Sequence, residues 1–201
     1  LTARSEPNEE RKETMKKLLC SAFALALLAG ILPVLAEEEK ADNKDAKRQE
    51  INAMADEALT KLTGKSAGAK SLYDKAYGYA VFDNLKIAIG ISGGGGSGVA
   101  VAKDGSERTY MKMGTGGVGL GLGGQKYQVV FFFETEKTFR SFVDKGWKAE
   151  TGAQAAAGTA GASAEVTFHN GLAIYKMNDA GLMASADVSG TKYWKNKKLN
   201  E

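Results

Sequence analysis

The sequence predicts an α+β protein in which a glycine-rich, mostly antiparallel sheet or partly closed barrel packs with two or three helices. Two observations lead to this fold class. Segments with helical and strand spacing follow one another in the order helix, sheet, helix, sheet, and not in the strict alternation of a parallel design. In addition, glycine occupies every second position from Gly117 to Gly123, and a period of two is the spacing of a β-strand.

The glycine row predicts a strand with two unlike faces. Val118, Leu120 and Leu122 point to one face, and the other face is bare backbone. Glycine weakens a strand interior, so a row of it indicates that another layer packs closely there. We therefore expect a helix or a second sheet layer to meet the structural glycines Gly117, Gly119, Gly121 and Gly123.

The first 36 residues have the pattern of a targeting segment. Residues 1–14 are polar and are interpreted as an upstream extension that precedes Met15. Residues 15–36 combine a basic start, an apolar run and small residues before a cleavage site, so we predict a signal peptide cut after Ala36. Cys20 is the only cysteine and lies inside this segment, so the mature chain has no thiol chemistry. The expected location is the bacterial periplasm, in association with a membrane.

The mature chain is predicted to begin with a mobile acidic and basic leader, residues 37–49, before a single domain of residues 50–201. Apolar residues from Ala46 to Leu62 recur at helical spacing, and Gly64 ends that helix. A short helix over residues 67–76 follows. Strand signals come next in three pieces, at residues 77–82, 87–91 and 99–102.

The second half of the sequence is also predicted to combine strands with a helix. Lys103 to Ser106 is typical of a hairpin turn, and the spacing predicts strands over residues 110–124 and 127–133. Residues 134–147 are helical in spacing, and residues 149–164 lack the side chains to build a core, which predicts a mobile loop. Three short strands complete the sheet, at residues 172–176, 182–186 and 191–194.

Several catalytic and binding classes find no support in the sequence. Three matches to the dinucleotide pattern occur among the glycines, but none opens a helix that could hold a pyrophosphate. Ser92 stands in a nucleophile-elbow pattern, with His169 later in the chain, yet four glycines follow where the elbow needs a helix. With one histidine and no mature cysteine, neither a metal nor another cofactor is implied.

Charge also limits the partners. Without the five basic and four acidic residues of the first 36, the chain keeps 22 basic and 20 acidic residues, which is no signature of nucleic-acid binding. Glu37-Glu38-Glu39 opens the mature chain, but basic residues lie near the start of the helix predicted from Ala46, and lysines close the chain beside Tyr193 and Trp194. Such mixtures attract anionic lipid head groups. The predicted lipid-binding residues are Lys47, Arg48, Ile51, Lys192, Tyr193, Trp194, Lys195, Lys197 and Lys198.

Over residues 50–196 the chain resembles the SYLF domain, a family of lipid-binding modules. Four segments carry the resemblance: Gly78 to Phe82; Gly94 to Val101 with Asp104-Gly105; Gly117 to Gly124 with Val129 to Phe133, Phe139 and Phe142; and Tyr175 with Gly181-Leu182 and Gly190 to Trp194. The resemblance implies a non-enzymatic domain that binds phospholipid through a basic, amphipathic N-terminal segment. That segment matches Lys47, Arg48 and Ile51. Residues 176–180 are longer and more acidic than the family pattern, which argues against phosphoinositide recognition.

Three functions follow as hypotheses. The first is non-enzymatic binding of anionic phospholipid at a membrane surface in the bacterial periplasm. The second is a structural or assembly protein of the cell envelope, which forms a homo-oligomer through its glycine-rich sheet. The third is a serine hydrolase that uses Ser92 and His169.

Overall fold

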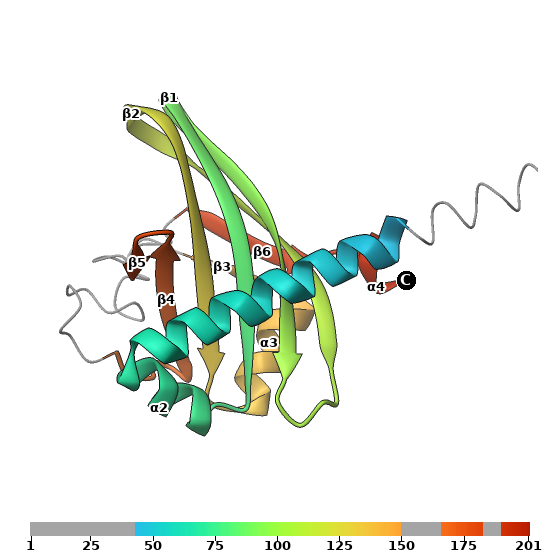
Figure 1. Cartoon of the computed structure of the whole chain (residues 1–201). Coiled ribbons are helices and arrows are strands. Elements are labelled where there is room, and N and C mark those ends of the chain that lie inside the picture. Colours follow the sequence, from blue (N-terminus) through green and yellow to red (C-terminus); the bar gives the residue numbers. More distant parts are fainter. Residues whose placement is uncertain (1–42, 150–165, 183–189) are drawn as a thin grey trace, which may run out of the picture. The chain divides into compact units, whose positions relative to one another are not determined.

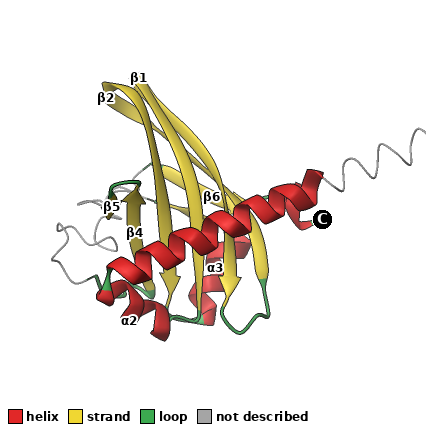
Figure 2. Ribbon diagram, in the orientation of Figure 1, coloured by secondary structure: helices red, strands yellow, loops and turns green. Residues whose placement is uncertain are grey.

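The computed structural model describes residues 43–149, 166–182 and 190–201. Its internal contacts divide the chain into a unit of Leu1–Ala46 and a unit of Lys47–Glu201. Helices and an antiparallel sheet of six strands make up the described part, so the predicted α+β class with a curled sheet is confirmed (Figure 2).

One long hairpin forms the centre of the sheet. Strand β1 (Gly78–Ala102) pairs with strand β2 (Arg108–Phe133) from Gly78↔Phe133 to Val101↔Arg108. Near its C-terminal end β2 also pairs with β4 (Leu172–Asn178), which pairs with β5 (Gly181–Leu182). Near its N-terminal end β2 pairs with β6 (Thr191–Lys195), which pairs with β3 (Trp147–Lys148).

Four helices accompany this sheet in the described residues. The longest, here called the long helix, covers residues 43–65, and α2 (Ala67–Lys75) follows it after the N-cap Ser66. Helix α3 (Glu136–Lys145) begins after Thr135, whose hydroxyl accepts from the Thr138 amide, and ends before Gly146 at a φ of 72°. Helix α4 (Lys197–Asn200) is a single turn that follows β6.

Strand β1 folds back on itself, so that its two halves run side by side (Figure 1). The carbonyl oxygen of Leu85 lies 2.7 Å from where a Cβ of Gly94 would stand, and the Val101 oxygen is equally close to that of Gly78. Between these points the Asp83 oxygen occupies the Cβ position of Gly96, and the Val81 oxygen that of Gly98. We call this line of contacts the seam. It requires glycine, because a side chain would overlap the facing backbone.

The seam arises because both strands of the hairpin reverse direction together. The reversal, here called the far bend, includes residues 88–92 of β1 and 117–122 of β2. The pairing register shifts there: Ile89 faces Leu122, but Ile91 faces Val118, so four residue steps on β2 oppose two on β1. Such a bulge bends a strand and increases its twist. The glycine row of the sequence therefore lies at a sharp bend.

Away from the far bend, the inner face of the sheet is buried, and so is the part of the outer face beneath the long helix and α2. The inner face carries Phe82, Phe131 and Phe133, which pack with Phe139 and Phe142 of α3 and with Tyr193 of β6. The outer face carries valines of both halves of β1, and the long helix and α2 cover it. The long helix buries Ile51, Ala55, Ala58 and Leu62, each at most 3% exposed, which confirms the predicted apolar stripe.

Several predicted boundaries were wrong. The three strand pieces before residue 103 form one continuous strand, as do the two pieces after residue 107, because the glycine run stays paired through the bend. Residues 43–49, predicted as part of a mobile leader, are helical. Helix α4 and the two-residue strand β3 were not predicted. Three predictions lie wholly or mostly outside the described residues: the loop at 149–164 beyond Ala149, the strand at 182–186 beyond Leu182, and the targeting segment.

Of the four predicted structural glycines, the structure describes the side-chain surroundings of Gly123 alone. The surroundings of Gly117, Gly119 and Gly121 lie outside the described side-chain environment, so their close packing stays a prediction. At Gly123 the structure places nothing within 4 Å of a Cβ position, and the residue has a φ of 146°. Its glycine is needed for the backbone conformation and not for close packing. The structure shows a close backbone approach of the expected kind along the seam, at Gly94, Gly96 and Gly98.

The seam predicts a sharp difference between two neighbouring glycines. Gly96→Ala should lower the free energy of unfolding by about 1–3 kcal/mol, because its methyl group must displace the Asp83 carbonyl. Gly93→Ala is the matched control, since nothing lies within 4 Å of its Cβ position. That variant should stay within about 0.5 kcal/mol of the parent or gain slightly, because alanine restricts the unfolded chain. Equal effects in urea denaturation would contradict the seam.

Candidate functional site

The structure brings the two predicted basic segments together. The Arg48 Nε of the long helix donates to the Leu199 carbonyl of α4 at 3.0 Å. Leu199 and Ile51 belong to the same buried cluster, which fixes α4 beside the start of the long helix. The start of the long helix and the β6–α4 segment, about 150 residues apart in the sequence, thus form one surface, here called the basic surface.

Tyr110 of β2 holds this junction in place. Its carbonyl accepts from the Asn196 amide at 2.9 Å and from the Asn200 Nδ2 at 2.7 Å, and its own amide donates to the Asn200 Oδ1 at 3.0 Å. Its hydroxyl accepts from the Asn52 Nδ2 of the long helix at 3.1 Å. Hydrogen bonds from both helices to one strand residue give the basic surface a fixed geometry.

Exposure divides the predicted lipid-binding residues into two groups. Lys192, Trp194, Lys195, Lys197 and Lys198 are exposed, and Lys47 and Arg48 are partly exposed. Ile51 and Tyr193, however, are 3% and 0% exposed. Alternation along β6 turns Tyr193 into the aromatic core while Trp194 faces out. The structure therefore corrects the predicted surface at these two positions.

Two further lysines lie on the same outward sheet face. Lys112 of β2 faces Trp194 in the strand register, and Lys148 of β3 faces Lys192. Both are exposed. Sequence reasoning missed them because only the strand pairing places them beside β6. Two lysines directly opposite each other repel, so this arrangement is unfavourable unless an anion lies close to it.

The charges on this surface are only partly compensated. Lys47 pairs with Glu50 at 2.7 Å, and Lys195 lies 3.5 Å from an Asp144 oxygen. For the remaining lysines, the described part of the chain supplies no ion pair: Lys112, Lys148, Lys192, Lys197 and Lys198. Trp194 is 38% exposed and lies over Gly114, with its ring 3.1 Å from the Cβ position. The surface thus combines uncompensated cations with an exposed indole.

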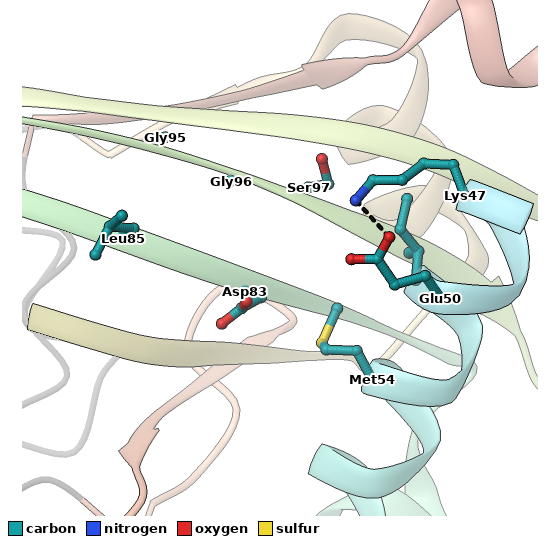
Figure 3. A pocket seen from close by; sticks show the side chains of 9 residues that line it. Lys47, Glu50, Met54, Asp83, Leu85, Gly95, Gly96 and Ser97 are labelled. Atoms are coloured by element: carbon teal, nitrogen blue, oxygen red, sulfur yellow. Dashed lines mark hydrogen bonds and ion pairs between the residues drawn. The ribbon is translucent and has the colours of Figure 1, made fainter. Parts of the chain in front are cut away.

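A small pocket opens where the long helix passes over the seam. It has a volume of about 230 Å³ and is lined by both halves of β1, with Asp83 and Leu85 on one side and Gly95, Gly96 and Ser97 on the other (Figure 3). Lys47, Glu50, Ile51 and Met54 complete it from the helix. Its volume is below the range typical of ligand sites. Lys47 and Glu50 at its rim are paired with each other.

The hydrolase hypothesis lacks its structural context. Ser92 lies within β1 in register with Gly117, so no strand-to-helix elbow forms around it. His169 is exposed in the turn before β4, next to Asn170 at a φ of 52°. In the described residues no group of three or more histidine, cysteine or acidic side chains could hold a metal ion. No helix among these residues is long and apolar enough to cross a membrane.

Burial of Tyr193 has consequences that can be measured. Its hydroxyl is buried without a hydrogen-bond partner among the described residues, and burial, with a smaller effect of Tyr127, raises its pKa well above the ordinary value. Because the folded protein keeps this hydroxyl neutral, its titration leaves the free energy of unfolding unchanged below the unfolded pKa of about 10. Above that pH the unfolded state ionises first, and the free energy of unfolding falls.

Tyr193→Phe should therefore leave the neutral-pH free energy of unfolding within about 1 kcal/mol of the parent or raise it, because an unpartnered buried hydroxyl is removed. The decline of stability above pH 10 should become shallower in the variant, as measured by urea denaturation from pH 8 to 11. A large loss of stability at neutral pH would show that the hydroxyl makes an essential bond.

Comparison with known proteins gives two matches. Residues 114–201 match the Ysc84 family model, described as "Las17-binding protein actin regulator". Beta cell expansion factor A of Aeromonas veronii is 42% identical over 151 residues. The aligned region covers 75% of this chain and 58% of that relative, so the chain spans little more than half of the relative's length.

Proposed function

We propose, on the premise that residues 114–201 belong to the Ysc84 (SYLF) domain family, that the chain binds anionic phospholipid at a membrane surface and catalyses no reaction. The observation that carries this proposal is the basic surface. Its lysines come from the long helix, β2, β3, β6 and α4, and one of them, Lys112, is the strand partner of the exposed Trp194. Indole rings settle at the level of lipid head groups, and surface lysines contribute about 1 kcal/mol each to binding anionic membranes.

The proposed location is the bacterial periplasm. Support comes from the sequence, where residues 15–36 have the order of a secretory signal peptide with cleavage after Ala36. In that compartment the available anionic surfaces are bilayer leaflets. The basic surface would then hold the protein at a leaflet.

A protein partner is the competing interpretation, since the family description speaks of actin regulation. The basic surface could also face an acidic protein. We favour lipid because Trp194 stands exposed among lysines, and a head-group region accommodates an indole ring and cations together. Sedimentation with filamentous actin in the absence of lipid is the comparison that separates the two.

Removal of uncompensated charge should weaken lipid binding. The chain from Glu37 onward keeps every described residue, and we expect it to sediment with phosphatidylglycerol vesicles at low salt. Replacement of Lys192, Lys197 and Lys198 by glutamine should weaken binding by about two orders of magnitude, because each lysine lost costs about 1 kcal/mol. The dependence on salt should become weaker as well.

A matched control removes the same charge elsewhere. Lys65, Lys75 and Lys137 are exposed, lie outside the basic surface and have no ion pair in the described structure. Their replacement by glutamine should change binding less than twofold to threefold. Equal losses in both triple variants would mean that net charge alone matters, and no vesicle binding by the parent chain would refute the proposed function.

A further inference from the structure

Large apolar side chains stand exposed on the approach to the far bend. Leu85 is 44% exposed and Ile87 is 50% exposed, and with Trp194 they are the exposed large hydrophobics of the described residues. Both belong to β1 and are two residues apart, so they share the outer face of the sheet. The same face buries Tyr79 and Val81 nearer the helices.

The cover provided by the helices ends before these residues. Met54 of the long helix and Leu85 both line the small pocket, which marks the edge of the covered region (Figure 3). Beyond it the hairpin continues toward the far bend, past the long helix and α3 (Figure 1). Apart from Ser92, the residues of the far bend are apolar or glycine, with isoleucine at 89 and 91. Large apolar side chains that the described residues leave exposed indicate an external apolar partner.

Lysines accompany these apolar side chains. Lys126 of β2 faces Leu85 in the strand register and is exposed, and Lys86 follows Leu85 in the sequence. Residues directly opposite each other on an antiparallel pair have Cβ atoms about 5 Å apart, so a cation stands at the base of the apolar projection. Asp83, one position further toward the helices on this face, is the neighbouring acid. Lys126 stands level with Leu85, Lys86 follows Leu85, and Ile87 lies beyond both lysines, nearest the far bend. Acyl chains lie beneath the phosphates of a bilayer, and long lysine side chains can reach back to the phosphates while apolar groups enter the acyl region.

We propose that Leu85 and Ile87, on the approach to the far bend, insert into the acyl boundary of an anionic bilayer, with the ammonium groups of Lys86 and Lys126 at the level of the phosphates. This inference rests on the proposed function and adds a second contact to it, separate from the basic surface. It also gives a reason for the length of the hairpin, because a shorter one would end beneath the long helix. A second copy of the chain is a less suitable occupant, because like-charged lysines beside the apolar side chains would oppose each other across such an interface.

A fluorescent label can locate the contact. The chain from Glu37 onward contains no cysteine, so Ile87→Cys accepts a single environment-sensitive nitrobenzoxadiazole group. On vesicles of equal parts phosphatidylglycerol and phosphatidylcholine, its emission should shift to the blue and aqueous iodide should no longer quench it. Ser106→Cys is the matched control, because it lies in the turn at the opposite end of the same hairpin. Its emission and quenching should not change.

A second variant tests the inference without a label. Leu85→Ser combined with Ile87→Ser removes apolar area but no charge, so the double variant should lose about tenfold in vesicle affinity. The loss should persist in about 1 M salt, where charge interactions are screened within about 3 Å. Ser106→Ala together with Glu107→Gln, in the opposite turn, should leave the salt-resistant affinity unchanged.

The outcomes separate the two proposals. If the protein binds vesicles but aqueous iodide still quenches the label at position 87, insertion beside the far bend is overturned and the proposed function stands. Absence of vesicle binding would overturn both. A blue shift that grows with protein concentration and needs no vesicles would place a second copy on the far bend and overturn the inference.

Discussion

The structure depends on the close approach of backbone to backbone along the seam. Facing carbonyl oxygens occupy the positions where Gly94, Gly96 and Gly98 would carry Cβ atoms. The contacts are of the Cα–H···O=C kind that recurs between adjacent strands, weak singly but repeated along the line. Because the two halves of β1 lie together, one hairpin closes the sheet into a curled layer. No strand from another part of the chain is needed on that side.

The seam also determines what the helices can cover. Its two halves bring Val81 and Val99 together under the long helix, whose alanines allow close packing, while the inner face fills with rings around Tyr193. The cover extends only part of the way along the hairpin, and the far bend projects beyond it. Two surfaces of different chemistry result from one topology. Lysines and Trp194 gather where the start of the long helix, β6 and α4 meet β2, and exposed apolar side chains with lysines beside them stand near the far bend.

Much of the fold could be predicted from local patterns, and what failed was non-local. The stripe from Ile51 to Leu62, the turn at 103–106 and α3 follow from spacing and capping, which the sequence carries directly. The glycine run after Ser92 was interpreted as a break between strands, because the backbone that requires glycine there is the first half of the same strand, and no local signal indicates this packing. The basic segments were identified from composition. Only the pairing of β2, β3 and β6 added Lys112 and Lys148, and only the alternation along β6 turned Tyr193 inward.

The central claim is that the two halves of β1 lie in direct backbone contact, and nuclear Overhauser effects between α-protons test it most directly. In the structure the Cβ position of Gly96 lies 3.1 Å from the Asn84 Cα, and Met113 is its partner across the hairpin. The account predicts strong effects between the Gly96 and Asn84 α-protons, together with those from Gly98 to residues 81 and 82. Effects from Gly96 to β2 residues alone, with none to residues 81–84, would show an open hairpin and contradict the account.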